Sequence, residues 1–547
     1  MMSAEDMAHG GSEFAGYEMT RRKLLQGAAV LGVAVGVGGP LAACGGSGSS
    51  ASPAASPTAG LTRKKGGNLR IAMSGSTRAT LDAHLLASND DEALCMCLYD
   101  TLYRWDSATA MPTPMLATEI TPNDAAGSVW TIKLRPDVVF HNGRTLSADD
   151  VIFSFQRIVN PKTHADLVLE ILNMSQMDVK RLKKVDNLTV EVPLKKPNAI
   201  FTHQMAEERV KIVPVGYDPN NPVGTGPFKY SSFVPGETAT FVANHDYWGE
   251  GPYVDQAEIT FLTDETARIN ALLSGTVELV AQLPFGTVKT ISSSSGFAVL
   301  NTPSGNWDPM NMLCSKAPFD DLRVRQAFRL IADREEIVRL ALNGFGRIGN
   351  DLNAPYEPGY PRDLPQRQQD IEKAKSLLKA AGQEGLKLDF VTSPMDQGLV
   401  EAAQVFAQQA AKAGVTLNIR KVDQATFWDQ YEPSDMKVPF TNEYWNARPY
   451  LDQTVLSIGT AAGSRNICHW VVPEWDKLVA EAIGTTDETK RNELVGEAMT
   501  IEYNVGPHIV YGFKNAVDGF STKVVGLKPN KMGLPLNQYQ FNLLSFA

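Results

Sequence analysis

The sequence predicts a mixed α/β fold, and a strand–helix–strand unit between residues 386 and 420 is the clearest observation behind this prediction. Leu386, Leu388 and Phe390 alternate with charged residues, which is the period of a strand. Residues 400–413 carry apolar residues at helical spacing and end at Gly414, before a second alternating run at 415–419. A helix between two strands predicts a parallel pair. Ligands gather beyond the carboxyl ends of such strands, so we expect Thr392–Met395 near a cleft.

The second observation is a set of short segments in which apolar and polar residues alternate. The first lies at 67–73, a second is centred on Trp130, Ile132 and Leu134, and a third lies at 188–194. Each predicts a strand with one buried face. Between the last two, Ser147 is followed three residues later by Asp150, a variant capping box that predicts the start of a helix.

Two further helices are predicted after residue 318. Val324, Ala327, Phe328 and Ile331 lie at i, i+3, i+4 and i+7, which places them on one buried stripe. Asp333 precedes a second apolar pattern and predicts its N-cap.

Composition limits the classes of protein to which the chain can belong. The 547 residues are 43% hydrophobic and 20% charged, which is ordinary for a folded protein and long enough for two or three lobes. The formal net charge is −10 and the pI about 5.4, so we expect no nucleic-acid partner, because binding to phosphates needs a basic face.

The first 65 residues predict an export signal followed by a tether. A twin-arginine segment, Thr20–Leu25, precedes an apolar run at 28–43 that is shorter than the roughly twenty residues a membrane helix needs. Leu41–Cys44 resembles the lipobox of bacterial lipoproteins. We therefore predict a signal peptide at 1–44, lipidation at Cys44, and a flexible Gly/Ser/Pro tether at 45–65.

Several motifs of the remaining chain resemble the peptide and nickel branch of the extracytoplasmic solute-binding proteins of family 5. The resemblance covers roughly residues 66–547 in the right order. The segments that carry it are YDTLY at 99–103, PMLA at 114–117, WTIKLR at 130–135, VFHNG at 139–143, LSADDV at 146–151, VGTGPF at 223–228, NHDYW at 244–248, PFDD at 318–321 and RVRQA at 323–327.

The resemblance implies a type II periplasmic-binding-protein fold of cluster C, with three lobes and a ligand cleft between two main lobes joined by a hinge. Lobe I would comprise residues 66–105, 222–302 and 510–547, lobe II an insertion at 106–221, and lobe III residues 303–509. The chain would cross between the main lobes near residues 302 and 510, and hinge closure would enclose the solute.

The same resemblance places part of the ligand site at Tyr444, Trp445, Asn446 and Arg448. In peptide-binding members this stretch carries an aromatic residue, then small polar residues, then an aspartate that pairs with the ammonium of the peptide. Trp445 fits the aromatic residue, but Arg448-Pro449 stands where the aspartate is expected. Either Arg448 binds a carboxylate or phosphate of the solute, or it only shapes the loop through carbonyls of lobe III or Asp452.

Four more residues are candidate ligand contacts. Asn306 and Trp307 follow the predicted hinge strand, and Ser74 and Thr77 follow the first strand. For Tyr444 and Trp445 the alternative is core packing, and for Ser74 and Thr77 it is a simple turn.

We expect a binding protein with no cofactor and no enzymatic activity, since no catalytic or nucleotide-binding signature is present. It would capture a small peptide-like or anionic solute, work as a monomer, and deliver the solute to the permease subunits of an ABC importer. The alternatives are a receptor of the same fold for a sugar, an opine-like acid or a metal chelate, a secreted hydrolase, and a signalling or adhesion lipoprotein. Among the cysteines Cys95, Cys97, Cys314 and Cys468, a Cys314–Cys468 disulfide competes with four small buried side chains.

Overall fold

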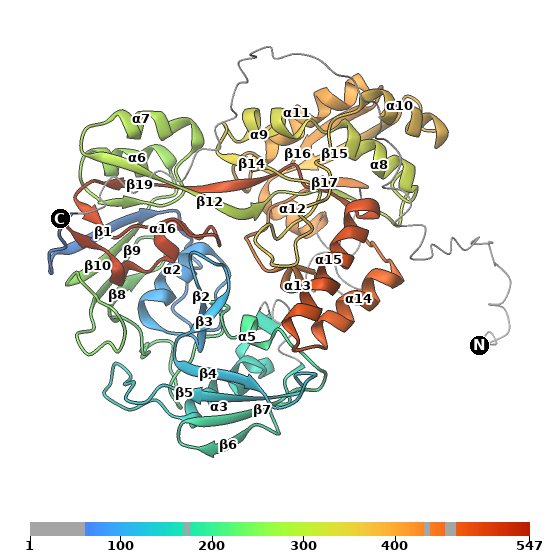
Figure 1. Cartoon of the computed structure of the whole chain (residues 1–547). Coiled ribbons are helices and arrows are strands. Elements are labelled where there is room, and N and C mark those ends of the chain that lie inside the picture. Colours follow the sequence, from blue (N-terminus) through green and yellow to red (C-terminus); the bar gives the residue numbers. More distant parts are fainter. Residues whose placement is uncertain (1–60, 167, 170–175, 432–437, 455–465) are drawn as a thin grey trace, which may run out of the picture. The chain divides into compact units, whose positions relative to one another are not determined.

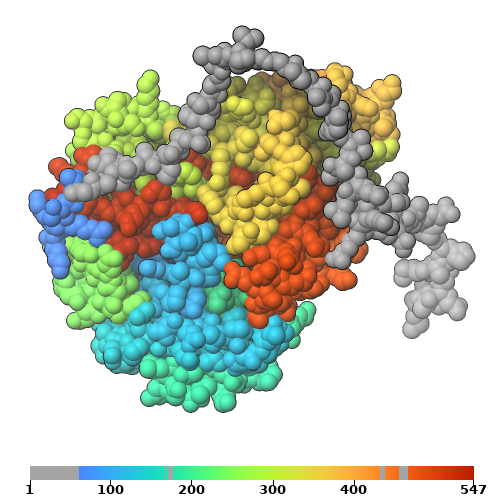
Figure 2. All heavy atoms as spheres, viewed as in Figure 1, coloured from blue at the N-terminus to red at the C-terminus, as the bar shows by residue number. Residues whose placement is uncertain are grey.

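The computed structural model describes residues 61–166, 168–169, 176–431, 438–454 and 466–547. The predictions for the signal peptide, for Cys44 and for most of the tether lie outside the described residues. Within the described part, Lys64 already pairs with Phe546 near the end of the chain. Figure 2 accordingly shows the first described residues in blue beside C-terminal residues in red.

The largest sheet, which we call sheet I, has eight strands in the order β12-β19-β11-β1-β10-β9-β8, with β14 paired to β19 (Figure 1). The strand β1 is parallel to β10 and β11, and the other pairs are antiparallel. The predicted strand at 67–73 is confirmed as β1, with Leu69 and Ile71 buried. The bounds are β1 (Asn68–Met73), β8 (Phe228–Val234), β9 (Thr238–Ala243), β10 (Gln256–Phe261), β11 (Leu279–Val280), β12 (Phe297–Trp307), β14 (Gly346–Ile348) and β19 (Gly512–Ser521). Three helices follow strands of this sheet in the sequence: α2 (Asn89–Leu98) after β1, α6 (Glu265–Leu273) after β10 and α7 (Val288–Ser293) after β11.

Sheet II has four strands in the order β4-β5-β7-β6. Two of the predicted strands are confirmed here as β5 and β7. The predicted helix start is also confirmed, because Ser147 is the N-cap of α3 and forms a capping box with Asp150. The bounds are β4 (Ala117–Pro122), β5 (Val129–Leu134), α3 (Ala148–Ile158), β6 (Lys183–Asp186), β7 (Thr189–Pro193) and α5 (Phe201–Gln204), and a small pair, β2 (Tyr103–Trp105) and β3 (Pro112–Pro114), precedes them.

Sheet III has five strands in the order β16-β15-β17-β13-β18. The predicted strand–helix–strand unit is confirmed, since β15 and β16 are parallel and α11 lies between them in sequence. Phe390 of β15 and Phe406 of α11 both pack on Phe440 of β17, at the centre of this part's core. The bounds are β13 (Met310–Met312), β15 (Lys387–Thr392), α11 (Leu399–Lys412), β16 (Thr416–Lys421), β17 (Phe440–Asn442) and β18 (His508–Ile509).

The remaining helices lie in the sequence between β13 and β18, the first and last strands of sheet III. The predicted helices after residue 318 are confirmed as α8 and α9, and the Asp333 side chain accepts a hydrogen bond from the Glu336 amide at the start of α9. The bounds are α8 (Leu322–Ile331), α9 (Arg334–Ala341), α10 (Ile371–Ala380), α12 (Gln424–Gln430), α13 (Tyr450–Gln453), α14 (Pro473–Ile483) and α15 (Glu488–Val505).

Two long antiparallel neighbours, β12 and β19, lead between sheets I and III. The chain leaves sheet I after β12, pairs with sheet I again through the short strand β14, and finally returns with β19. Their shared ladder has an irregularity between Thr302 and Asn306, so the pair changes register where the chain approaches sheet III. The exact limits of the three lobes stay a prediction.

The predicted disulfide between Cys314 and Cys468 is wrong. All four described cysteines are free, although the Cys314 amide donates a hydrogen bond to the Cys468 carbonyl. Three of the four are buried, as expected for small apolar side chains. Among the described helices, none has the length and apolar character that a membrane crossing requires.

Candidate ligand site

A cavity of about 410 Å³ lies between sheet I and sheet III, and its walls come from the carboxyl ends of parallel strands. On the sheet I side it is lined by Ser74 after β1, Thr263 after β10 and Gln282 after β11. All three strands run in the same direction, so their carboxyl ends meet at one edge. Such edges are where α/β folds hold ligands.

On the sheet III side the same cavity is lined by residues that follow β15 and β17. Pro394 to Gln397 follow β15, and Tyr444 and Asn446 follow β17, which is parallel to β15. The hinge strands contribute Asn306 and Lys514. The volume lies within the range of pockets that enclose small molecules.

Four of the residues predicted for the site line this cavity: Ser74, Asn306, Tyr444 and Asn446. Asn306 also links neighbouring segments, because its Oδ1 accepts from the Ala447 amide at 2.9 Å and its Nδ2 donates to the Gly533 carbonyl at 3.3 Å.

Three other predicted residues do not line the cavity. The backbones of Trp307 and Trp445 exchange two hydrogen bonds, of 2.9 and 3.0 Å, and both side chains belong to a small apolar cluster. Trp307 is only 1% exposed and lies edge-on to His508, which is core packing. Thr77 is exposed on the surface beside Gly236.

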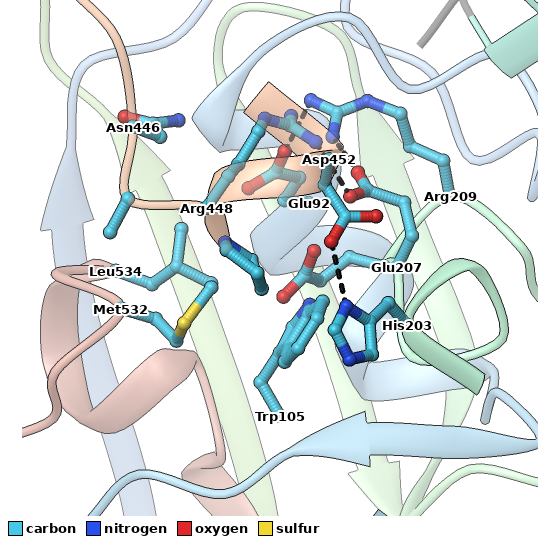
Figure 3. A pocket seen from close by; sticks show the side chains of 13 residues that line it. Glu92, Trp105, His203, Glu207, Arg209, Asn446, Arg448, Asp452, Met532 and Leu534 are labelled. Carbon is cyan, nitrogen blue, oxygen red and sulfur yellow. Dashed lines mark hydrogen bonds and ion pairs between the residues drawn. The ribbon is translucent and has the colours of Figure 1, made fainter. Parts of the chain in front are cut away.

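Arg448 lies in a separate, much smaller cavity of about 30 Å³ (Figure 3). Its Nη1 donates to Oε2 of Glu207 at 2.9 Å, a partner that neither predicted role of Arg448 included. Asp452, the alternative partner, accepts instead from Nδ1 of His203 at 2.8 Å. Both pairs connect the segment after β17 to the chain beside α5.

The Arg448–Glu207 pair is the end of a chain of four charges. Arg209 donates through Nη1 to Glu207 and through Nη2 to Glu92 of α2, each at 2.5 Å (Figure 3). Burial acts to raise the pKa of Glu207, but Arg448 and Arg209 outweigh it, and the pKa is lowered. Among the described residues, Glu92 has only Arg209 within ion-pair distance. Burial, reinforced by the neighbouring Glu207, therefore prevails and raises the pKa of Glu92.

A second buried charge cluster lies at the hinge. Lys514 of β19 pairs with Asp308 at 3.2 Å and, more closely, with Asp396 of the cavity wall. Burial, reinforced by the neighbouring Asp396 carboxylate, raises the pKa of Asp308 to about 6 despite the opposing effect of Lys514. Two carboxylates therefore share one ammonium group.

Sequence patterns did not indicate Asp396, Lys514 or Arg268, all of which line the cavity. The only available signal was that Asp396 directly follows the Thr392–Met395 segment that we expected near a cleft. Lys514 and Arg268 lie within a strand and a helix whose periodicity gives no reason to single out either charge.

Comparison with known proteins agrees with this geometry. The family model for bacterial extracellular solute-binding proteins, family 5 (middle), matches residues 111–466, more than half of the chain. The chain belongs to this family.

Relatives and solved structures extend the match over most of the chain. The dipeptide-binding protein of Escherichia coli K12 is 24% identical over 479 residues, covering 81% of this chain and 88% of that protein. Heme-binding protein A of Haemophilus influenzae is 25% identical over 469 residues, covering 80% and 85%. The periplasmic binding protein DppA from Helicobacter pylori, solved with the peptide STSA, aligns with a TM-score of 0.75 at 22% identity, over 88% of this chain and 98% of that one.

These matches confirm the predicted fold class, a type II periplasmic-binding-protein fold. They also confirm the predicted function, because the family consists of extracytoplasmic solute-binding proteins that act in transport.

Proposed function

We propose that this chain captures a small peptide-like solute in the 410 Å³ cavity and delivers it to the permease of an ABC importer. The observation that carries this proposal is the convergence of strand ends on one cavity. Strands β1, β10 and β11 of sheet I and strands β15 and β17 of sheet III all end there. A solute between them would contact both main parts of the chain at once and so stabilise their closed arrangement.

A peptide-like solute is favoured by the relatives, two of which are named for dipeptides or were solved with a peptide. A non-peptide solute is favoured by Arg448, which stands where peptide-binding members carry an aspartate. Arg448 has no carboxylate with which to bind a peptide ammonium group, and its guanidinium is paired with Glu207. A receptor for another small solute of the same fold is therefore the second candidate.

The lipid anchor belongs to the same proposal. Twin-arginine export followed by lipidation of Cys44 would display a monomeric receptor outside the cytoplasmic membrane, close to its permease. Metabolic labelling with an alkyne fatty acid tests this directly. The wild-type chain should be labelled and Cys44→Ser should not, and an unlabelled wild-type chain would contradict the anchor while leaving solute capture intact.

The proposed capture is tested by mass spectrometry of small molecules released from the purified full chain by denaturation. Short peptides would support the peptide proposal. A sugar, an acidic metabolite or a metal chelate would support the second candidate. A chain that carries nothing and binds no solute in a thermal-shift screen would contradict capture.

A further inference from the structure

Among the described residues that line the proposed ligand cavity, one buried cation has no counter-ion. Arg268, on α6, lines the cavity and is only 6% exposed. Its Nη1 donates to the carbonyls of Leu262, at 2.6 Å, and Thr263, at 3.0 Å, the two residues that follow β10. Because the Leu262 amide bonds to the Met73 carbonyl at the end of β1, the guanidinium group is fixed at the edge where these parallel strands end.

Within the described part of the chain, no carboxylate lies within 4.0 Å of the Arg268 guanidinium nitrogens. Other buried arginines are compensated: Arg209 pairs with two glutamates, and Arg334 pairs with Asp351. Burial lowers the pKa of Arg268, although Glu265 and Asp264 act to raise it. These two acids are exposed to solvent and lie beyond ion-pair distance.

Arg325 is a second buried arginine that bonds only to carbonyls. Its guanidinium donates to the carbonyls of Phe319, Asp320 and Val505 through two nitrogens, its buried Nε has no partner among the described residues, and it does not line the cavity. In Arg268 only Nη1 donates. Its Nε and Nη2 form no hydrogen bond with the described residues and, unlike Nε of Arg325, are not fully enclosed by protein atoms. Two nitrogens of a rigid planar fork, with three N–H groups, therefore remain for a solute.

The other cation of the cavity wall does not compete for this role. Lys514 forms ion pairs with both Asp308 and Asp396. Since two carboxylates face one ammonium group, the hinge cluster carries an excess of negative charge. An oxyanion in the cavity would be repelled from Asp396 on the sheet III side and attracted to Arg268 on the sheet I side, where the other carboxylate of the lining, Glu265, is exposed to solvent and therefore screened.

We propose that Arg268 is the oxyanion subsite of this cavity and that the captured solute carries a carboxylate or phosphate group. This inference rests on the proposed capture of a solute between sheets I and III. It assigns the recognition of negative charge to Arg268 in place of Arg448, whose guanidinium is paired with Glu207.

The test screens the full chain, purified in detergent, by native mass spectrometry against paired solutes, one with and one without an oxyanion. The pairs are glycyl-leucine against glycyl-leucinamide and glucose 6-phosphate against glucose, which distinguish a carboxylate from a phosphate. In at least one pair the wild-type chain should bind the member with the carboxylate or phosphate about tenfold or more tightly than the member without it, because hydrogen bonds between charged groups are roughly twice as strong as neutral ones. Arg268→Gln should lose this preference, and Arg268→Lys should recover part of it.

Arg325→Gln is the matched control, because it removes a buried arginine that also bonds only to carbonyls. It should lower stability without changing the preference for the solute that carries the oxyanion. Equal binding of the two members of each pair, or an Arg268→Gln chain that keeps the wild-type preference, would overturn the subsite while leaving solute capture standing. If no solute of either class binds the folded wild-type chain, capture itself is contradicted and the subsite falls with it.

Discussion

The Nη1 atom of Arg448 lies 2.9 Å from Oε2 of Glu207, and this ion pair joins the segment after β17 to the segment after α5. The two side chains are only 14% and 6% exposed. Through Arg209 the pair continues to Glu92 on α2, so the chain of charges links sequence segments that are more than a hundred residues apart. Arg448, which the resemblance predicts to stand where peptide-binding members carry an aspartate, is thus engaged within the protein.

Removing Arg448 should destabilise the empty protein. Arg448→Ala leaves the buried carboxylates of Glu207 and Glu92 with a single shared arginine, and breaking a buried pair costs about 3 kcal/mol. Urea unfolding measures the change in the free energy of unfolding. Arg420→Ala is the control, because its pair with Asp389 is largely exposed and should contribute less than about 1 kcal/mol. Equal losses in the two variants would contradict the role of the buried chain.

Glu502 should contribute a loss of protein stability as pH rises towards 7. Burial raises the pKa of this carboxyl to about 7, although Tyr450 and Arg329 oppose the shift, and Asp351 reinforces it. The folded state therefore holds a proton that the unfolded state has already released. This stabilisation is complete below the ordinary glutamate pKa and is lost as pH rises through 7, with a slope of about 1 kcal/mol per pH unit.

Glu502→Gln should remove this contribution to the pH slope, because the amide resembles the protonated acid at every pH. Chemical unfolding of wild type and variant between pH 5 and 8 provides the comparison, and Glu384→Gln, at an exposed position, should keep the wild-type slope. A Glu502→Gln slope equal to that of wild type would assign the effect to another group.

Substitutions should separate the predicted residues that line the cavity from those that do not. Tyr444→Ala removes a half-buried aromatic wall, and we expect solute affinity to fall about tenfold with little change in melting temperature. Thr77→Ala should leave the affinity unchanged, since Thr77 lies outside the cavity. Calorimetry with the co-purified solute measures both, and the opposite pattern would move the binding site.

Trp307→Ala should act on stability. This side chain is enclosed by Val510 and Phe513, and truncating a buried tryptophan costs about 3–5 kcal/mol. Thermal unfolding should show a large drop in the melting temperature of Trp307→Ala. The half-buried Trp445 should cause a smaller drop when it is replaced by alanine. A Trp307→Ala chain that melts normally but no longer binds solute would return Trp307 to the ligand site.

Local structure could be predicted from the sequence because it depends on residues close together in the chain. The period of two at β1 and β5, the caps of α3 and α9, and the parallel β15–β16 pair all come from such short-range patterns. One cavity is lined by Ser74, Asn306, Tyr444 and Asn446. Their selection as site residues depended on the family resemblance and not on periodicity.

The charge clusters could not be predicted because their partners are distant in sequence. Lys514 and Asp396 are 118 residues apart, and Arg448 and Glu207 are 241 apart. Nothing in the local pattern around Arg268 indicates that its helix faces a cavity or that no carboxylate comes close. Such pairings depend on how the sheets are connected, which hydrophobic periodicity does not encode.

We propose that a solute binds between the carboxyl ends of the sheet I and sheet III strands. Hydrogen–deuterium exchange of the full chain, with and without its co-purified solute, tests it most directly. We predict slower exchange on both sides of the cavity, at residues 74–77 and 263–268 and at 394–397 and 444–446. Slower exchange confined to the small Arg448 cavity, or no change at these four segments, would contradict the account.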